Sequence, residues 1–130
     1  MMVLATGFAL LLAASQGEVF VAQGDTIVIA GTPIRISGID MPRASHREAE
    51  RARNGMQEIV RNRFVACRVS DEMVSNHRLG NCTADGEDIA ATLVALGLAL
   101  DCERYSEGRY RALEPAGARE RLTASPDCRD

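Results

Sequence analysis

The stretch from Gly24 to Arg43 constrains the fold of this chain more than any other. It holds two β-branched runs, Thr26–Ala30 and Ile34–Ile36, which Gly31-Thr32-Pro33 separates. Just before it, residues 18–23 alternate around Val19 and Val21. Alternation and β-branched runs bounded by glycine and proline are typical of strands joined by tight turns. The sequence therefore predicts three short consecutive strands that form a meander.

Polar side chains stand at the ends of these predicted strands. Asp25 follows the first strand, Arg35 lies in the third, and Asp40 stands at its exit. A meander brings such ends together, and two carboxylates beside a guanidinium can hold a hard cation against a phosphate. The alternative interpretation is that both acids belong to turns and strand ends, with Arg35 as their salt-bridge partner.

A helix is expected after Pro42. Ser45 and Glu48 have the spacing of a capping box, and the helix should continue to about Asn62. Apolar residues spaced by three and four define its expected buried side: Ala49, Ala52, Met56, Ile59 and Val60.

Two further strands are predicted at residues 64–69 and 79–83. If they form a hairpin folded near Val74-Ser75, Cys67 and Cys82 fall opposite each other. That arrangement favours a Cys67–Cys82 disulfide and leaves Cys102 with Cys128. The four cysteines contain no C-x-x-C pair, which argues against a zinc site.

The remainder of the chain reads as helical. Asp88 can cap a second helix, whose inner face is expected to hold Ile89, Leu93, Leu96 and Leu100. Residues 105–122 predict a more broken helical region, with the last helix beginning at Pro115. The tail from residue 123 to 130 is expected to be irregular and tied down by Cys128.

The order of these elements indicates an α+β fold. Three strands, a helix, two strands and then helices fit a five-stranded OB-fold β-barrel with about three helices. With 130 residues, the chain has room for one domain, which we assign to residues 16–130.

The first fifteen residues, Met1–Ser15, carry no charged side chain and include an apolar run too short to span a bilayer. This pattern predicts a secretory signal cleaved near residue 15. An uncleaved membrane tether or a buried first strand are the alternatives. Export to the periplasm or the medium fits an even number of cysteines, because disulfides persist in oxidising compartments. After cleavage we expect no stable membrane insertion and a monomer.

The charge balance limits how the chain can bind nucleic acid. The net charge is −3, and all fifteen basic residues are arginines. An acidic domain has no global field that gathers nucleic acid, so phosphate binding must be local. A basic segment runs from residue 43 to 68, but a solvated helix face with internal ion pairs explains it equally well.

Several motifs, taken in order, resemble the staphylococcal-nuclease-like (thermonuclease) family. The resemblance runs from about Val19 to Arg121. It rests on Gly24-Asp25-Thr26, on residues 35–42 (RISGIDMP), on His77-Arg78 in place of the family's Tyr-Gly-Arg region, on residues 93–99 (LVALGLA), and on the spacing of Tyr110, Glu114 and Ala118-Arg119.

The resemblance implies a function and a set of site residues. Asp25 and Asp40 match the family's calcium-binding aspartates, with the backbone carbonyl of Met41 as a further ligand. Arg35 and Arg78 match the two arginines that hold the scissile phosphate. The implied activity is Ca²⁺-dependent hydrolysis of phosphodiester bonds in DNA or RNA, with single-stranded nucleic acid as the expected partner.

Two positions depart from the family pattern. Gln23 stands where the family has a first acid, and Arg43 stands where it has the glutamate general base. A general base is worth about 10²–10⁴-fold in rate, so its loss predicts weak or lost activity. His46 and Glu48 are the candidates to replace it.

Two other functions stay open from the sequence. The same barrel could be a non-catalytic module that binds nucleic acid, a nucleotide or a protein. The scarcity of aromatic residues argues against strong binding of single strands, which depends on stacking. A disulfide-stabilised envelope protein without a ligand is the third interpretation.

Overall fold

The computed structural model of this chain describes residues 10–14, 18–42 and 45–128. Most of the predicted signal, at residues 1–9 and 15, therefore lies outside the described residues. So does Arg43, the residue in the position of the general base.

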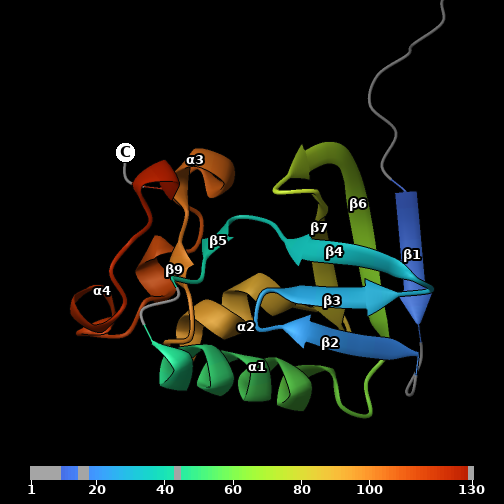
Figure 1. Cartoon of the computed structure of the whole chain (residues 1–130), viewed down its shortest axis with the longest axis horizontal. Helices are drawn as coiled ribbons and strands as arrows, with labels where there is room; N and C mark the ends of the chain where they lie inside the picture. The colour runs from blue at the N-terminus through green and yellow to red at the C-terminus, as the bar shows by residue number, and fades with distance from the viewer. Residues whose placement is uncertain (1–9, 15–17, 43–44, 129–130) are drawn as a thin grey trace, which may run out of the picture.

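The centre of the molecule is a strongly curled β-sheet with the shape of a half-barrel (Figure 1). Its strands follow the order β1-β6-β7-β4-β3-β2, and β8 pairs with β7. The bounds are β1 Leu10–Ala14, β2 Val19–Gln23, β3 Thr26–Ile29, β4 Thr32–Ile36, β6 Val65–Val74, β7 His77–Ala84 and β8 Glu87–Asp88. A separate two-stranded ladder joins β5 (Ile39–Asp40) to β9 (Leu100–Asp101).

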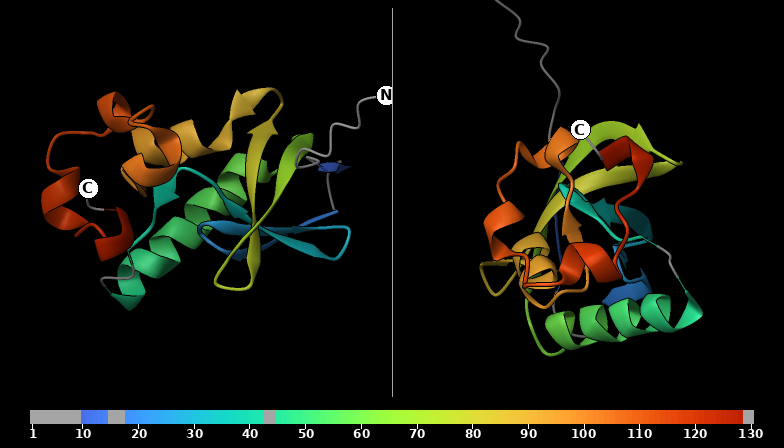
Figure 2. Two further views of the ribbon diagram at one scale, coloured as in Figure 1. Left: turned by 90° about the horizontal axis from the view of Figure 1, so that it is seen from above. Right: turned by 90° about the vertical axis from the view of Figure 1, so that its left-hand side faces the viewer.

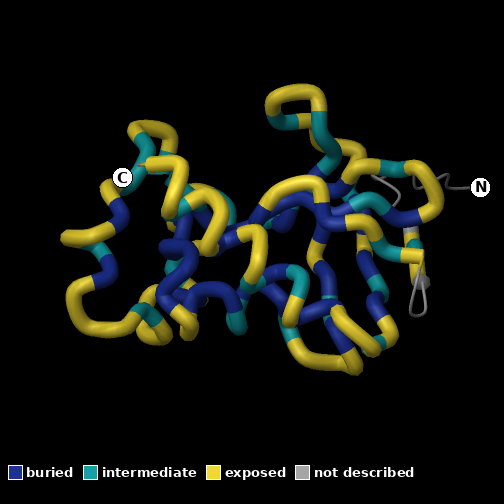
Figure 3. Tube along the Cα trace, turned by 60° about the horizontal axis from the view of Figure 1, so that its bottom comes forward, coloured by how far each residue is buried: buried dark blue, intermediate teal, exposed yellow. Residues whose placement is uncertain are grey.

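The meander predicted from the sequence is present. The strands β2, β3 and β4 pair in antiparallel order, and β4 then pairs in parallel with β7. Side chains alternate along each strand, so Ile34 and Ile36 of β4 enter the core while Arg35 faces the other side. The fold is therefore mixed α+β, with β-branched residues filling the inside of the curled sheet. Figure 3 marks the stretches of the chain that are buried.

Helices cover one side and one end of the sheet (Figures 1 and 2). Their bounds are α1 His46–Val60, α2 Ile89–Ala95, α3 Glu103–Ser106 and α4 Ala118–Arg121, with short 3-10 turns at Arg111–Leu113 and Pro126–Cys128. The Ser45 hydroxyl caps α1 by accepting a hydrogen bond from the amide of Glu48 at 3.1 Å. Asp88 caps α2, as predicted, by accepting from the amides of Ala90 and Ala91.

The predicted inner face of α1 is correct except at one position. Ala52, Met56, Ile59 and Val60 are buried, whereas Ala49 is exposed. Ala49 lies in the first turn, where α1 extends past the edge of the sheet and lines a surface cavity.

The predicted second helix was longer than the observed α2. The helix ends at Ala95, and Gly97 follows with φ of 74°, a backbone conformation that reverses the chain. Leu96 is consequently 55% exposed rather than buried. Leu100 is buried, but it lies in β9 and packs with Ala118 and Leu122 in a separate cluster.

The last helix also begins later than predicted. Residues 105–122 are broken into short helical pieces, as expected, but α4 begins at Ala118 rather than at Pro115. Gly117, with φ of 83°, directly precedes the helix, and this left-handed conformation excludes it from the helical turn.

The C-terminal third is fastened to the sheet by a buried phenol. The Tyr110 hydroxyl donates to Oδ2 of Asp88 at 2.6 Å and accepts from Nη2 of Arg109 at 3.0 Å. Burial, followed by the bond to the Asp88 carboxylate, raises the pKa of Tyr110 to about 12. One side chain thus joins this region to the cap of α2.

The residues Leu10–Ala14 form strand β1, which pairs antiparallel with β6 and sets Leu12 opposite Cys67. This corresponds to the first-strand alternative of the sequence analysis, although Leu11 is 71% exposed, so the strand is an edge rather than a buried element. Cleavage of the predicted signal stays a prediction.

Both predicted disulfides are present, and they pair all four cysteines of the chain. Cys67 and Cys82 are in register across β6 and β7, with Cα atoms 4.0 Å apart. Cys102 and Cys128 join the start of α3 to the tail, with Cα atoms 4.8 Å apart. Such pairing indicates an oxidising, extracytoplasmic setting. Within the described ranges, no helix has the length and apolar character needed to cross a bilayer.

Candidate functional site

The structure brings four of the predicted site residues together around one cavity. Asp25, Arg35, Asp40 and Met41 line a hollow of about 340 Å³. The other lining residues are Gln23, Thr26, Pro42, Ser75, His77 and Ser125. The cavity is therefore built from the meander, from the β6–β7 turn and from the C-terminal tail.

Local backbone geometry places the acidic and basic groups. Thr26 of β3 is in register with Arg35 of β4, so Asp25 stands beside the guanidinium at the edge of the sheet. The Asp25 carbonyl accepts a hydrogen bond from the amide of Ile36 at 2.8 Å. Gly24 lets α1 pack closely against this turn, because a Cβ there would lie 2.6 Å from the Cβ of Ala52 in α1.

Asp25 and Arg35 partly neutralise each other. Nε of Arg35 lies 3.5 Å from Oδ2 of Asp25, and the hydroxyl of Thr26 donates to Oδ1 at 2.9 Å. Asp25 is only 8% exposed, so its carboxylate requires these partners. With Nε turned to Asp25, the terminal nitrogens of Arg35 are the groups that can reach a ligand.

The Asp40 carboxylate is held by Ser125, which lies in the C-terminal tail. Its Oδ2 accepts from the amide of Ser125 at 2.6 Å, and its Oδ1 accepts from the Ser125 hydroxyl at 2.7 Å. Asp40 is 4% exposed. Both carboxylate oxygens thus already have a donor. The sequence carries no local signal for this contact, because Ser125 reaches the site only through the path of the tail.

Arg78 does not join the other predicted residues. Its Nη2 lies 3.4 Å from Oδ1 of Asp71 on β6, and the described residues that line the Arg35 cavity do not include it. Its neighbour His77 lines the cavity instead. His77 was part of a motif in the sequence but was not predicted as a site residue, although the alternation of side chains along a strand would separate it from Arg78.

The candidates for a replacement base lie outside this cavity. The Glu48 carboxylate is 3.0 Å from Nη1 of Arg121 and 3.9 Å from Nη1 of Arg51. The His46 side chain is 94% exposed and 3.9 Å from Glu50. His46 lines a neighbouring cavity of about 320 Å³, which shares four lining residues with the first: Gln23, Asp25, Met41 and Pro42.

The calcium ion that the resemblance implies stays a prediction. Calcium takes six to eight oxygen ligands, among them carboxylates, backbone carbonyls such as that of Met41, and water. Asp25 and Asp40 supply two carboxylates, and each already bonds to protein donors. Among the residues that the structure describes, no group of three His, Cys, Asp or Glu side chains could hold a metal ion.

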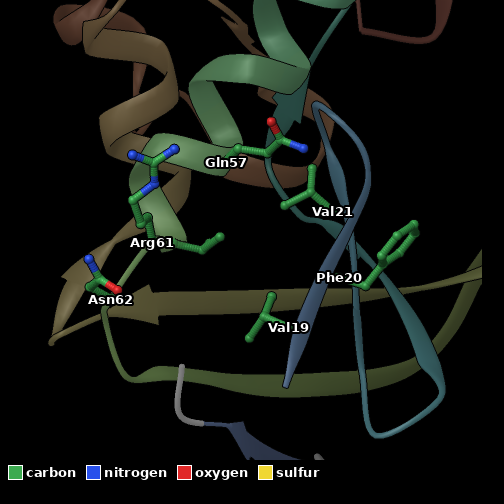
Figure 4. Close-up of a pocket in the computed structure, with 7 residues that line it drawn as sticks. Val19, Phe20, Val21, Gln57, Arg61 and Asn62 are labelled. Atoms are coloured by element: carbon green, nitrogen blue, oxygen red, sulfur yellow. The ribbon is translucent and has the colours of Figure 1, made fainter. Parts of the chain in front are cut away.

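A further hollow of about 300 Å³ lies between β2 and the end of α1 (Figure 4). Val19 and Val21 of β2 project toward Gln57 and Arg61 of α1, while Phe20 points to the opposite side of the strand. Its lining carries no acidic side chain, which distinguishes it from the Arg35 cavity.

Comparison of the chain with models of known protein families finds no match, and comparison with curated proteins finds none either.

Proposed function

We propose that this chain is an exported, thermonuclease-like protein that binds the phosphodiester backbone of DNA or RNA at the Arg35 cavity and hydrolyses it weakly or not at all. The observation that carries the proposal is the pair of hydrogen bonds from Ser125 to Asp40 beside an arginine-lined cavity. The arginine supports phosphate binding, and the occupied carboxylate argues against efficient metal-assisted hydrolysis.

The strand connections support an OB-fold within this proposal. An antiparallel meander is followed by a helix and then by a hairpin, whose second strand pairs in parallel with the third strand of the meander. That is the order of a five-stranded Greek-key barrel with a helix inserted after its third strand. It is also the order expected from the resemblance to the thermonuclease family.

The chemistry at Arg35 favours a phosphate ligand. A guanidinium presents donors in a planar fork that matches two phosphate oxygens. The Arg35 side chain is 31% exposed, enough to meet a ligand while Asp25 holds its Nε. With two acids beside it, this cavity suits one or two phosphates rather than a long anionic strand.

We expect weak hydrolysis because the residues that the family pattern requires for catalysis are replaced or already engaged. Arg43 replaces the glutamate base in the sequence, and Glu48 is engaged by Arg121. Without a general base and without a free pair of carboxylates, hydrolysis would depend on the charge of Arg35 to stabilise the transition state.

One experiment tests binding and cleavage together. The full-length protein is mixed with fluorescently labelled single-stranded DNA and RNA, in calcium or in a chelator. Anisotropy reports binding and gel electrophoresis reports cleavage. We expect binding that Arg35→Gln abolishes and Arg68→Gln, an exposed arginine on β6, leaves unchanged. Equal binding by both variants, or no binding at all, would overturn the proposal.

The cleavage arm tests the second half. We expect little cleavage in either condition, and new calcium-dependent cleavage in Arg43→Glu combined with Ser125→Ala. Rapid calcium-dependent cleavage by the unaltered protein that disappears in Asp40→Ala would show a competent nuclease. The predicted export is checked separately, by the N-terminal sequence of protein recovered from the periplasm or the medium, which should begin near residue 16.

A further inference from the structure

The register of β7 against β4 separates the two predicted phosphate-binding arginines. In this parallel pair Ile34 is opposite Arg78, and Arg35 is opposite Leu79. Residues opposite each other in a ladder project from the same face, and neighbours along a strand project from opposite faces. Arg78 therefore starts on the face of Ile34, whereas Arg35 shares its face with Leu79 and His77.

The contacts agree with this placement. Arg78 turns to Asp71 of the adjacent strand, while His77 lines the same cavity as Arg35, Asp25 and Asp40. The His77 ring is thus in the position, relative to Arg35, that the sequence resemblance gave to Arg78.

A hydrogen bond fixes the ring of His77. The β6–β7 turn is formed by Ser75 and Asn76, both with positive φ (52° and 67°). Nδ1 of His77 lies 3.0 Å from the carbonyl oxygen of Ser75. A carbonyl oxygen can only accept, so Nδ1 carries the proton in either charge state. Nε2 is then the only ring nitrogen left for a ligand.

We propose that His77, rather than Arg78, supplies the second contact to the bound phosphate, through a hydrogen bond that its protonated Nε2 donates. The inference rests on the proposed function and names a further residue of the same site. The charged groups that face His77 around the cavity are Asp25 from the β2–β3 turn, Arg35 from β4 and Asp40 from β5.

The test is a titration of a labelled ten-residue thymidylate with full-length protein. We expect the unaltered protein to bind about tenfold more tightly than His77→Ala, the worth of one charged hydrogen bond. His77→Asn should lose the same affinity, although its amide can still donate to the Ser75 carbonyl, which separates ligand contact from support of the turn.

Matched variants complete the design. Arg78→Gln and His46→Ala should keep the affinity of the unaltered protein. Unchanged affinity in His77→Asn, or loss of affinity in Arg78→Gln, would overturn the inference. Binding that requires Arg35 but not His77 would overturn this inference alone. Absence of any Arg35-dependent binding would overturn the proposed function as well.

Discussion

Ser125 donates two hydrogen bonds to Asp40, from its amide to Oδ2 at 2.6 Å and from its hydroxyl to Oδ1 at 2.7 Å, across 85 positions of sequence. A carboxylate that is 4% exposed has few other sources of solvation. The contact therefore ties the tail to the meander and fills the ligand positions of an acid that a metal ion would need.

Removal of the Ser125 hydroxyl should destabilise the fold. Hydrogen bonds to charged groups contribute about 1.5–3 kcal/mol, so we expect Ser125→Ala to lower the free energy of unfolding by roughly that amount. Urea denaturation measures the change. Thr123→Ala, which removes a hydroxyl from an exposed position of the same tail, is the control. Equal losses in the two variants would contradict the role given to Ser125.

The Cys102–Cys128 disulfide should hold the tail over the cavity. Its partners are 26 positions apart, and the chain-entropy model gives about 3 kcal/mol for closing a loop of such length. We expect Cys102→Ser combined with Cys128→Ser to lower stability by that order and to speed tryptic cleavage after Arg121. Cys67→Ser with Cys82→Ser serves as the comparison, since that pair lies inside a hairpin. Unchanged cleavage after Arg121 in the first variant would count against tethering by this disulfide.

A methyl group added at Gly24 should disturb the candidate site, because it would clash with the residues packed against that position. A Cβ there would lie 2.5 Å from Sδ of Met41 and 2.9 Å from the backbone carbon of Ala52. Overpacking of this kind costs about 1–3 kcal/mol. We expect Gly24→Ala to lower the melting temperature and to weaken phosphate binding, because Asp25 and Arg35 shift together. Wild-type affinity and stability in this variant would show that the close approach is not required.

The fold should lose stability at alkaline pH through Tyr110. Its pKa is raised from 10.0 to about 12 by burial and by Asp88. A raised folded-state pKa means that the neutral phenol is favoured by folding. The stabilisation of the fold by the neutral Tyr110 phenol is thus complete below pH 10. It is lost as pH rises from about 10 to about 12, and amounts to on the order of 2 kcal/mol in total.

Urea unfolding at pH 8, 10 and 11.5 measures this loss. Tyr110→Phe should be less stable than the unaltered protein at pH 8 and should show a smaller decline above pH 10. Tyr105→Phe should keep the full decline. An identical alkaline decline in both variants would assign it to other groups.

Local signals made much of the fold predictable. The alternation around Val19 and Val21 and the β-branched runs identify the meander, and the Asp88 cap marks the start of α2. Cys67 and Cys82 could be paired from sequence because a hairpin fixes its own register. Each of these features depends on residues close together in the chain.

The rest of the fold and of the site depends on the register between strands or on contacts between segments far apart in the sequence. Arg78 was expected beside Arg35, but a shift of one residue in register moves a side chain to the other face of a sheet, and sequence alone does not set the register of a parallel pair. Leu96 was expected inside because the apolar spacing continues past the point where Gly97 ends the helix. Ser125 could not be foreseen, since its position follows from the course of the whole C-terminal segment.

The position of Ser125 has a practical consequence for handling the protein. Ser125 of the tail lines the Arg35 cavity three positions before Cys128, so an affinity tag or fusion partner should leave the segment from Ser125 to Cys128 undisturbed. Strand β1 lies at the opposite end of the molecule (Figure 1). A tag placed on that side, after the predicted cleavage position near residue 15, would stay on the exported protein and leave the cavity clear for measurements of binding.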